Sequence, residues 1–276
     1  MEVTTKEGIY IYCIINSGKE QCFGAPGIGD RGDKLYCVSA DPPPTAPLSR
    51  PSRLATSDGA KGDGLCAVVS HSPMQKFKMS RDNLLAHERA IEEVMKTHTV
   101  LPVRFATVAE SEEKVRKILL KETERFSSLL REMDTRKELG VKAIFDSEKI
   151  YAQIGEQEEI KRLKARLSSL PADKIYFQKM ELGRMVEKAL EGERDKCRAE
   201  IMGALEPLAI DVKTAKPYGE MMILNAAFLV ERAREAEFDR TVHELNEKFS
   251  ALIEWRYIGT LPPFNFVNVE ISTKDL

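Results

Sequence analysis

The alternation of apolar and polar positions predicts a chain of alternating strands and helices. Five strands are expected in the first half, at residues 8–16, 34–39, 64–71, 100–108 and 137–146. The first of them is apolar on both faces, which is typical of a central strand covered on two sides. Two helices are expected among these strands. Ser80 is the expected N-cap of the first helix, and the second is expected to begin at Ser111.

These elements predict an N-terminal α+β domain over residues 1–146. Its strands are expected to carry the two helices on one side, in a ferredoxin-like arrangement. The segment at about residues 40–62 is rich in glycine and proline. A mobile loop is therefore expected there.

The pattern from residue 147 to residue 205 is helical and highly charged, with a break at Ser168-Ser169-Leu170-Pro171. Apolar stripes on both sides of the break predict an antiparallel, coiled-coil-like helical hairpin. The stripe of the first arm contains Ile150, Ile154, Leu163 and Leu167. The stripe of the second arm contains Leu182, Met185, Val186, Ala189, Leu190, Cys197, Ile201 and Leu205. Burial in the core is the favoured interpretation, and a solvent-exposed part would instead indicate a partner helix.

The last part of the chain predicts a small α+β layer over residues 207–272. Its strands are expected near residues 208–213, 221–230, 252–257 and 264–271, and its helix at residues 231–250. Together with the hairpin, this layer makes up an expected C-terminal domain at residues 147–276.

Composition fits a folded protein and narrows the classes of partner. Hydrophobic residues make up 42% of the sequence and charged residues 31%, which excludes an intrinsically disordered chain. The net charge of −2 lacks the basic excess that is typical of nucleic-acid-binding proteins. No apolar run reaches the roughly 18 residues that span a bilayer, and residues 1–8 contain no secretory core. A cytoplasmic location without membrane insertion is therefore expected.

Motifs for catalysis or ligand binding are weak. Residues 27–32 match the dinucleotide fingerprint Gly-x-Gly-x-x-Gly, but a strand and a proline cluster follow where the fingerprint needs a helix, which favours a simple turn. His87-Glu88 lacks the second histidine of a zinc-binding His-Glu-x-x-His motif. Because His87 lies on the apolar face of its helix, a hydrogen-bonded core histidine is favoured over a ligand or a base. We expect no catalytic residue, no cofactor and no metal site.

Two apolar segments hinged on proline are the most distinctive part of the sequence. They are Val100-Leu101-Pro102-Val103-Arg104-Phe105-Ala106-Thr107 and Gly259-Thr260-Leu261-Pro262-Pro263-Phe264-Asn265-Phe266-Val267. Each is typical of a short strand entered or left through proline, which cannot donate to a central ladder. Together with Leu84-x-x-His87-Glu88, they resemble the signature segments of the gas vesicle protein F/L family. The resemblance extends from Ile9 to Ile271.

The resemblance implies a non-enzymatic accessory or minor structural protein of gas vesicles, the gas-filled buoyancy organelles of prokaryotes. It implies contact with the small hydrophobic shell protein and with other accessory proteins during vesicle formation. It also implies a location in the cytoplasm and on the gas-facing side of the vesicle wall, with no nucleic-acid, membrane or small-molecule partner. The alternative is a small-molecule-binding regulatory protein, because ferredoxin-like halves often serve as ligand sensors.

Six residues of the proline-hinged segments and the chain end are candidates for contact with a partner: Arg104, Phe264, Phe266, Val267, Val269 and Ile271. Arg104 is the one charge in an apolar strand, so it either pairs with an acidic side chain or contacts a partner. The rings after the proline pair are either buried by a rigid strand entry or form an exposed aromatic edge. The alternation at residues 266–271 suits a strand that pairs with an unpaired edge of the shell protein.

Overall fold

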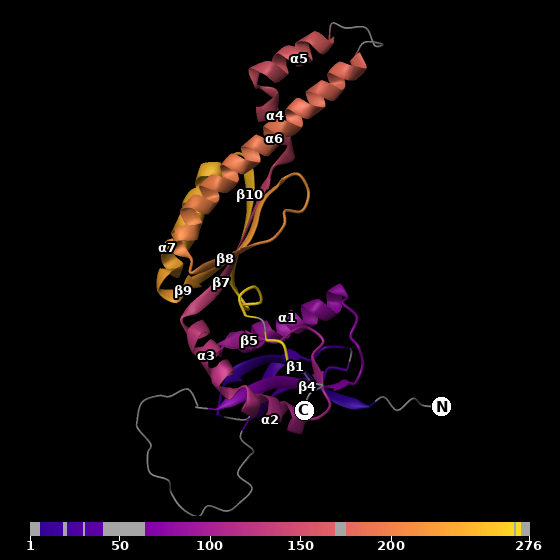
Figure 1. Ribbon diagram of the computed structural model, residues 1–276, viewed down its shortest axis with the longest axis vertical. Coiled ribbons are helices and arrows are strands. Elements are labelled where there is room, and N and C mark those ends of the chain that lie inside the picture. Colours follow the sequence, from indigo (N-terminus) through magenta and orange to yellow (C-terminus); the bar gives the residue numbers. More distant parts are fainter. Residues whose placement is uncertain are drawn as a thin grey trace, which may run out of the picture. The chain divides into compact units, whose positions relative to one another are not determined.

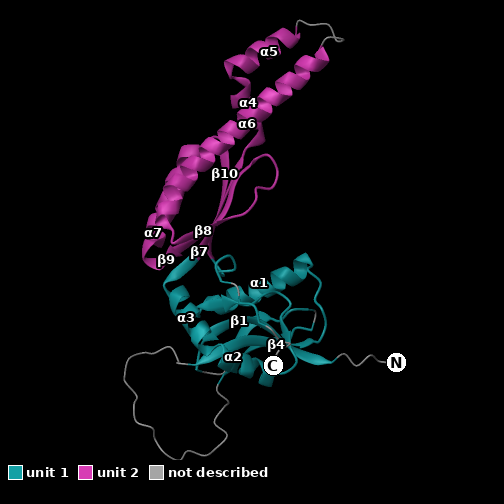
Figure 2. Cartoon of the chain, in the orientation of Figure 1, with its two compact units in different colours: residues 1–137, 261–276 teal, residues 138–260 magenta. Residues whose placement is uncertain are grey.

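The computed structural model describes residues 6–18, 21–29, 31–40, 64–168, 175–267 and 269–271 (Figure 1). Figure 2 colours two compact units: unit 1 contains residues 1–137 and 261–276, and unit 2 contains residues 138–260. The chain thus divides at residue 137 and again at residue 261, whereas the sequence suggests a single division after residue 146. Apart from residue 40, the loop expected at residues 40–62 lies outside the described residues.

Unit 1 is built on an antiparallel sheet around the buried strand β1 (Glu7–Asn16). The strand order is β2-β3-β4-β1-β5, and β6 also pairs with β1. The remaining bounds are β2 (Cys22–Pro26), β3 (Lys34–Ser39), β4 (Leu65–Pro73), β5 (Val100–Pro102) and β6 (Val108–Ala109). Between its two ends β1 is buried on both faces, as its apolar sequence indicates.

A turn interrupts the strand that the sequence predicts at residues 100–108. β5 ends at Pro102 and β6 begins at Val108, and Ala106 between them has a φ of 64°. A non-glycine residue in this left-handed conformation is held there by its surroundings. Here the Ala106 N–H donates to Tyr10 Oη at 2.9 Å. The single expected strand is therefore two short strands joined by an anchored turn.

Three helices flank the sheet of unit 1: α1 (Arg81–Met95), α2 (Glu112–Lys121) and α3 (Thr123–Asp134). The Ser80 and Ser111 hydroxyls each accept the backbone N–H three residues further on at 3.3 Å, which confirms both expected N-caps. The second expected helix is divided into α2 and α3. At the division, the Thr123 hydroxyl donates to the carbonyl oxygens of Leu119 and Leu120, a contact that bends helices.

The helices of unit 1 cover both faces of its sheet (Figure 1). The inner side of α1 packs with every second residue of the strands, among them Tyr10, Tyr12, Leu35, Cys37, Cys66 and Val68. Side chains alternate along a strand, so Tyr36 points to the opposite face, where its Oη donates to Glu112 of α2 at 3.0 Å. The sequence predicts the helices on one side only. Helices are needed on both faces of the sheet because β1 and β4 are apolar on both faces.

Unit 2 contains a second, smaller sheet in the order β10-β7-β9-β8. Its strands are β7 (Arg136–Phe145), β8 (Asp211–Thr214), β9 (Met222–Glu231) and β10 (Ile253–Leu261). The long helix α6 (Ile175–Leu205) and α7 (Glu235–Phe249) share one core with this sheet, through residues such as Ile201 and Phe238. The two sheets and the long helix confirm the predicted α+β class.

Two shorter helices, α4 (Ser147–Gly155) and α5 (Glu158–Ser168), pack against α6 (Figure 1). Ile150, Ile154 and Ile160 share a core with Leu190 and Cys197. Beyond Ser168, the break expected between the two arms lies outside the described residues. Among the helices that the structure describes, none combines the length and apolar character of a membrane span.

The segment after β10 differs from the strand expected at residues 264–271. The Pro263 carbonyl accepts the N–H groups of Phe266 and Val267, which closes a turn. Val269 then makes an isolated parallel bridge with Val103. The chain turns here because Pro262 and Pro263 have no N–H to extend a ladder. The strand expected at residues 208–213 is present as β8, but it begins only at Asp211, after a 3₁₀ turn at Glu206–Leu208. A second 3₁₀ turn, at Arg232–Arg234, precedes α7.

Candidate functional site

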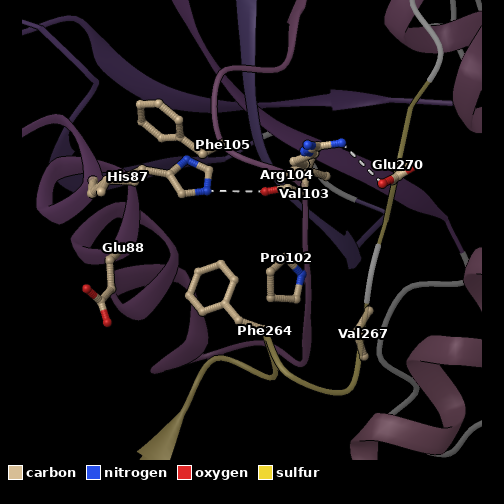
Figure 3. Close-up of a pocket in the computed structure, with 10 residues that line it drawn as sticks. His87, Glu88, Pro102, Val103, Arg104, Phe105, Phe264, Val267 and Glu270 are labelled. Carbon is tan, nitrogen blue, oxygen red and sulfur yellow. Dashed lines mark hydrogen bonds and ion pairs between the residues drawn. The ribbon is translucent and has the colours of Figure 1, made fainter. Parts of the chain in front are cut away.

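Three segments that are far apart in the sequence meet around one groove in unit 1 (Figure 3). They are the first half of α1, the turn after β5 and the segment after β10. The lining residues are Leu84, His87, Glu88, Pro102, Val103, Arg104, Phe105, Phe264, Val267 and Glu270. The groove has a volume of about 540 Å³. It therefore unites the two proline-hinged segments with the Leu84-x-x-His87-Glu88 motif.

His87 is the polar centre beneath this groove. It is 3% exposed, and its Nε2 lies 3.2 Å from the Val103 carbonyl oxygen (Figure 3). Because a carbonyl only accepts, Nε2 carries the proton, and Tyr10 Oη donates to the free Nδ1 at 3.1 Å. Tyr10 in turn accepts from the Ala106 N–H. These bonds tie α1 and β1 to the turn between β5 and β6.

Burial keeps His87 neutral. Desolvation of the imidazolium lowers the pKa of His87 to about 4, and the hydrogen bond to the Val103 carbonyl only partly opposes this effect. Both ring nitrogens are occupied by protein groups. The imidazole thus has no free lone pair with which to accept a proton from a ligand. The expectation of a buried, hydrogen-bonded core histidine is confirmed.

Aromatic rings pack around the imidazole. The ring centroids of Tyr10, Tyr12 and Phe105 lie 5.7 Å from that of His87, and the Phe264 centroid lies 6.2 Å away. Tyr12 is stacked with an interplanar angle of 24°, whereas Phe105 is edge-on at 87°. Phe105 and Phe264 also line the groove, so this cluster gives the groove a firm aromatic floor.

Part of the apolar lining remains in contact with solvent. Leu84 is 38% exposed and Phe264 is 41% exposed, although both are large apolar side chains. Phe105 is half-buried beside them. A cluster of exposed apolar side chains in a hollow is typical of a surface that contacts another molecule.

The end of the chain is anchored to the groove by two buried valines. Val267 is 4% exposed and Val269 is fully buried. The Arg104 N–H donates to the Val269 carbonyl at 3.4 Å, and the Arg104 guanidinium pairs with Glu270 at 3.2 Å (Figure 3). Both partners of this ion pair are mostly exposed, so its contribution to stability is small. The anchoring therefore depends mainly on the valines.

The six predicted contact residues have different environments. Arg104 and Phe264 are exposed at the groove, Phe266 and Ile271 are half-buried, and Val267 and Val269 are buried. Arg104 lies in a turn outside the strand, and its acidic partner is Glu270. Of the ten lining residues, sequence reasoning named only Arg104, Phe264 and Val267 as site residues, and it missed the other seven, among them Glu88, Phe105 and Glu270. Glu88 and Phe105 belong to the motif segments, but no local pattern indicates which of their side chains faces the hollow.

The glycine-rich match at residues 27–32 is the turn between β2 and β3, apart from Asp30, which lies outside the described residues. The Gly27 N–H donates to the Asp33 carbonyl at 2.7 Å, and the Ile28 N–H donates to Tyr12 Oη at 2.6 Å. Gly29 and Gly32 have positive φ values of 87° and 67°, which explains why glycine stands there. The simple turn expected from the sequence is confirmed, because β3 follows it. In the described part of the chain, no group of three or more histidine, cysteine, aspartate or glutamate side chains is placed to hold a metal ion.

A match to a family sequence model places the chain among gas vesicle synthesis proteins. The sequence model of the family described as "Gas vesicle synthesis protein GvpL/GvpF" matches residues 8–268, and the chain belongs to this family. The predicted resemblance to this family is thereby confirmed.

Two relatives show how similar individual members are. The chain is 28% identical to gas vesicle protein F of Nostoc sp. over 213 residues, which cover 75% of this chain and 86% of that protein. It is 29% identical to gas vesicle protein F of a Streptomyces species over 204 residues, which cover 74% of this chain and 84% of that protein.

Two crystal structures share the fold. The gas vesicle protein GvpF from Anabaena sp. has a TM-score of 0.69 and 23% identity, with 96% of this chain and 100% of that chain covered. GvpF from Microcystis aeruginosa has a TM-score of 0.61 and 20% identity, with 94% of this chain and 98% of that chain covered.

Proposed function

We propose that this protein is a non-enzymatic assembly protein of gas vesicles that binds apolar segments of the hydrophobic shell protein during vesicle formation. The groove in unit 1 is the observation that carries this proposal. The segments that resemble the family signature converge on it, and they leave Leu84 and Phe264 exposed there.

The physical reason is that a shell subunit must be kept from uncontrolled association before it joins the wall. Exposed apolar surface and unpaired strand edges aggregate readily. Burying one leucine-sized side chain contributes about 1.5–3 kcal/mol. A groove that covers one or two such side chains gives a weak contact, which can protect a subunit and still release it to the growing wall.

Contact through exposed side chains fits the site better than chemistry does. His87 has both ring nitrogens bonded within the protein, so it cannot serve as an acid or a base. Phe264 and Arg104 are exposed and can meet a partner directly. Val267 and Val269 are buried, and their role in the proposal is to hold the segment that presents Phe264.

The proposal includes a location and further partners. The protein acts in the cytoplasm at forming gas vesicles, on the gas-facing side of the wall, and it contacts other accessory proteins there. Its membership of the GvpL/GvpF family supports the association with gas vesicles.

Calorimetric titration of soluble shell-protein fragments into the full-length protein tests the proposal. We expect measurable binding by the wild type and at least about tenfold weaker binding by the double variant Leu84→Ser, Phe264→Ser, because two apolar contacts are lost. Leu120→Ser is the matched control, since Leu120 is 57% exposed on α2 and lies outside the groove lining. The proposal fails if the wild type does not bind the fragments, or if the control weakens binding as much as the double variant.

A small-molecule-binding regulatory protein is the second candidate. The groove volume of about 540 Å³ favours it, because small-molecule sites commonly measure about 300–1,000 Å³. Native mass spectrometry of the purified protein distinguishes the two. A retained small ligand that the Phe264→Ser variant loses would favour the regulatory function.

A further inference from the structure

One side of the groove carries unbalanced negative charge. Glu88 lines the groove and is half-buried. Glu92 follows it by one helical turn on α1 and is half-buried as well. Like charges at this spacing repel each other. Consistent with this, the pKa of Glu92 is raised, first by burial and then by the charge of Glu88, while Arg89 and Lys96 act in the opposite direction.

The other charges around the groove are balanced. Arg104 and Glu270 pair with each other at 3.2 Å on the opposite side, and His87 is neutral. Among the described residues, no lysine, arginine or histidine forms an ion pair with Glu88. The lining therefore contains apolar and aromatic side chains, the neutral His87, the Arg104–Glu270 pair, and Glu88 as the one carboxylate for which the described residues supply no ion-pair partner (Figure 3).

We propose that the groove takes a segment of the shell protein in which an apolar side chain is adjacent to a lysine or arginine. The apolar side chain packs against Leu84, Phe105 and Phe264, and the cation pairs with Glu88. This inference rests on the proposed function and specifies the chemistry of the segment that is bound.

The geometry gives the charge a role in specificity. An ion pair beside apolar surface is screened less by water than one on an open surface. Glu88 comes from α1, whereas the Arg104–Glu270 pair lies across the groove, so the cation has one favourable position. The carboxylate thereby selects which apolar segment binds and in which direction it lies.

Overlapping synthetic peptides that cover the shell-protein sequence test this inference, with dissociation constants measured by fluorescence anisotropy for the full-length protein. We expect the binding peptides to contain a basic residue next to an apolar one. Glu88→Lys should weaken their binding by about tenfold, and Glu88→Gln by less, because only the first variant adds repulsion. Exchanging the basic residue of the peptide for glutamate should restore binding to Glu88→Lys. Glu124→Lys is the matched control, since Glu124 is exposed on α3 outside the groove.

The outcomes separate this inference from the function on which it rests. If the wild type binds no peptide, both fail. If peptides bind and the Leu84→Ser, Phe264→Ser variant weakens them, but Glu88→Lys has no more effect than Glu124→Lys, the inference alone fails. Binding peptides that contain no basic residue would overturn it as well. Circular dichroism of each variant verifies that the fold is retained.

Discussion

Lowering the pH from 7.5 to 5 should destabilise unit 1, and His87 should be the residue responsible. The pKa of this histidine is about 4 in the folded chain, against an ordinary value of 6.5. Between pH 4 and pH 6.5, the two pKa values, His87 binds a proton in the unfolded chain but not in the folded chain. The free energy of unfolding therefore decreases as the pH falls through this window, and the contribution of His87 is complete above pH 6.5.

The size of this effect follows from the shift. The difference between the folded and unfolded pKa values of His87 corresponds to roughly 3 kcal/mol in the free energy of unfolding. Roughly 2 kcal/mol of this is lost between pH 7.5 and pH 5. Tyr10, which donates to His87 Nδ1, does not offset this loss, because burial raises the pKa of Tyr10 and keeps its hydroxyl neutral.

Hydrogen exchange of the β1 and α1 amides, corrected for the intrinsic effect of pH on exchange, measures this loss. His87→Gln removes the titrating group, so this variant should start less stable at pH 7.5 and lose less stability on acidification. His71→Gln is the matched control, because His71 is an exposed histidine on β4. If the wild type and His87→Gln lose the same stability between pH 7.5 and pH 5, the assignment of the effect to His87 is wrong.

Three further substitutions test other parts of the structure. Val269→Ala should reduce the free energy of unfolding by roughly 2 kcal/mol, because it truncates a fully buried anchor. It should also make the segment after β10 more sensitive to limited proteolysis, and unchanged cleavage would argue against the anchoring. Gly27→Ala should reduce the free energy of unfolding, measured by urea denaturation, by roughly 1–3 kcal/mol, because the new Cβ would lie 2.7 Å from Ser70 Oγ. An unchanged free energy of unfolding would contradict this close approach. Arg104→Ala should change the midpoint of unfolding only slightly, by less than about 1 kcal/mol, because its pair with Glu270 is exposed; a larger loss would show that the pair holds the segment.

The elements with strong local signals could be predicted from the sequence. The apolar segment at residues 8–16 forms the buried strand β1, and Ser80 and Ser111 cap their helices as expected. The interruption at Ala106 could not be predicted, because Tyr10 stabilises it from another strand. The turn at Pro263 was missed for a different reason. The alternation of apolar and polar residues that follows it is typical of a strand. In the structure, however, Val267 and Val269 are buried as anchors, and only Val269 pairs with another segment, through the isolated bridge to Val103.

The site was only partly visible in the sequence. The three motif segments stand out locally, but only the fold brings them together. Tyr10 and His87 are 77 positions apart in the sequence and are joined by one hydrogen bond. Glu270 could not be recognised as the partner of Arg104, because 166 positions separate them. The exposure of Leu84 also escaped prediction, since its position in the helical stripe is typical of a core residue.

Photo-crosslinking in cells that assemble gas vesicles tests the central claim most directly. A photoreactive phenylalanine analogue placed at Phe264 should crosslink to the shell protein, and the same analogue at Leu120, which is exposed outside the groove, should not. Equal crosslinking from both positions, or none from position 264 in cells that form vesicles, would contradict the assignment of the groove as the binding site.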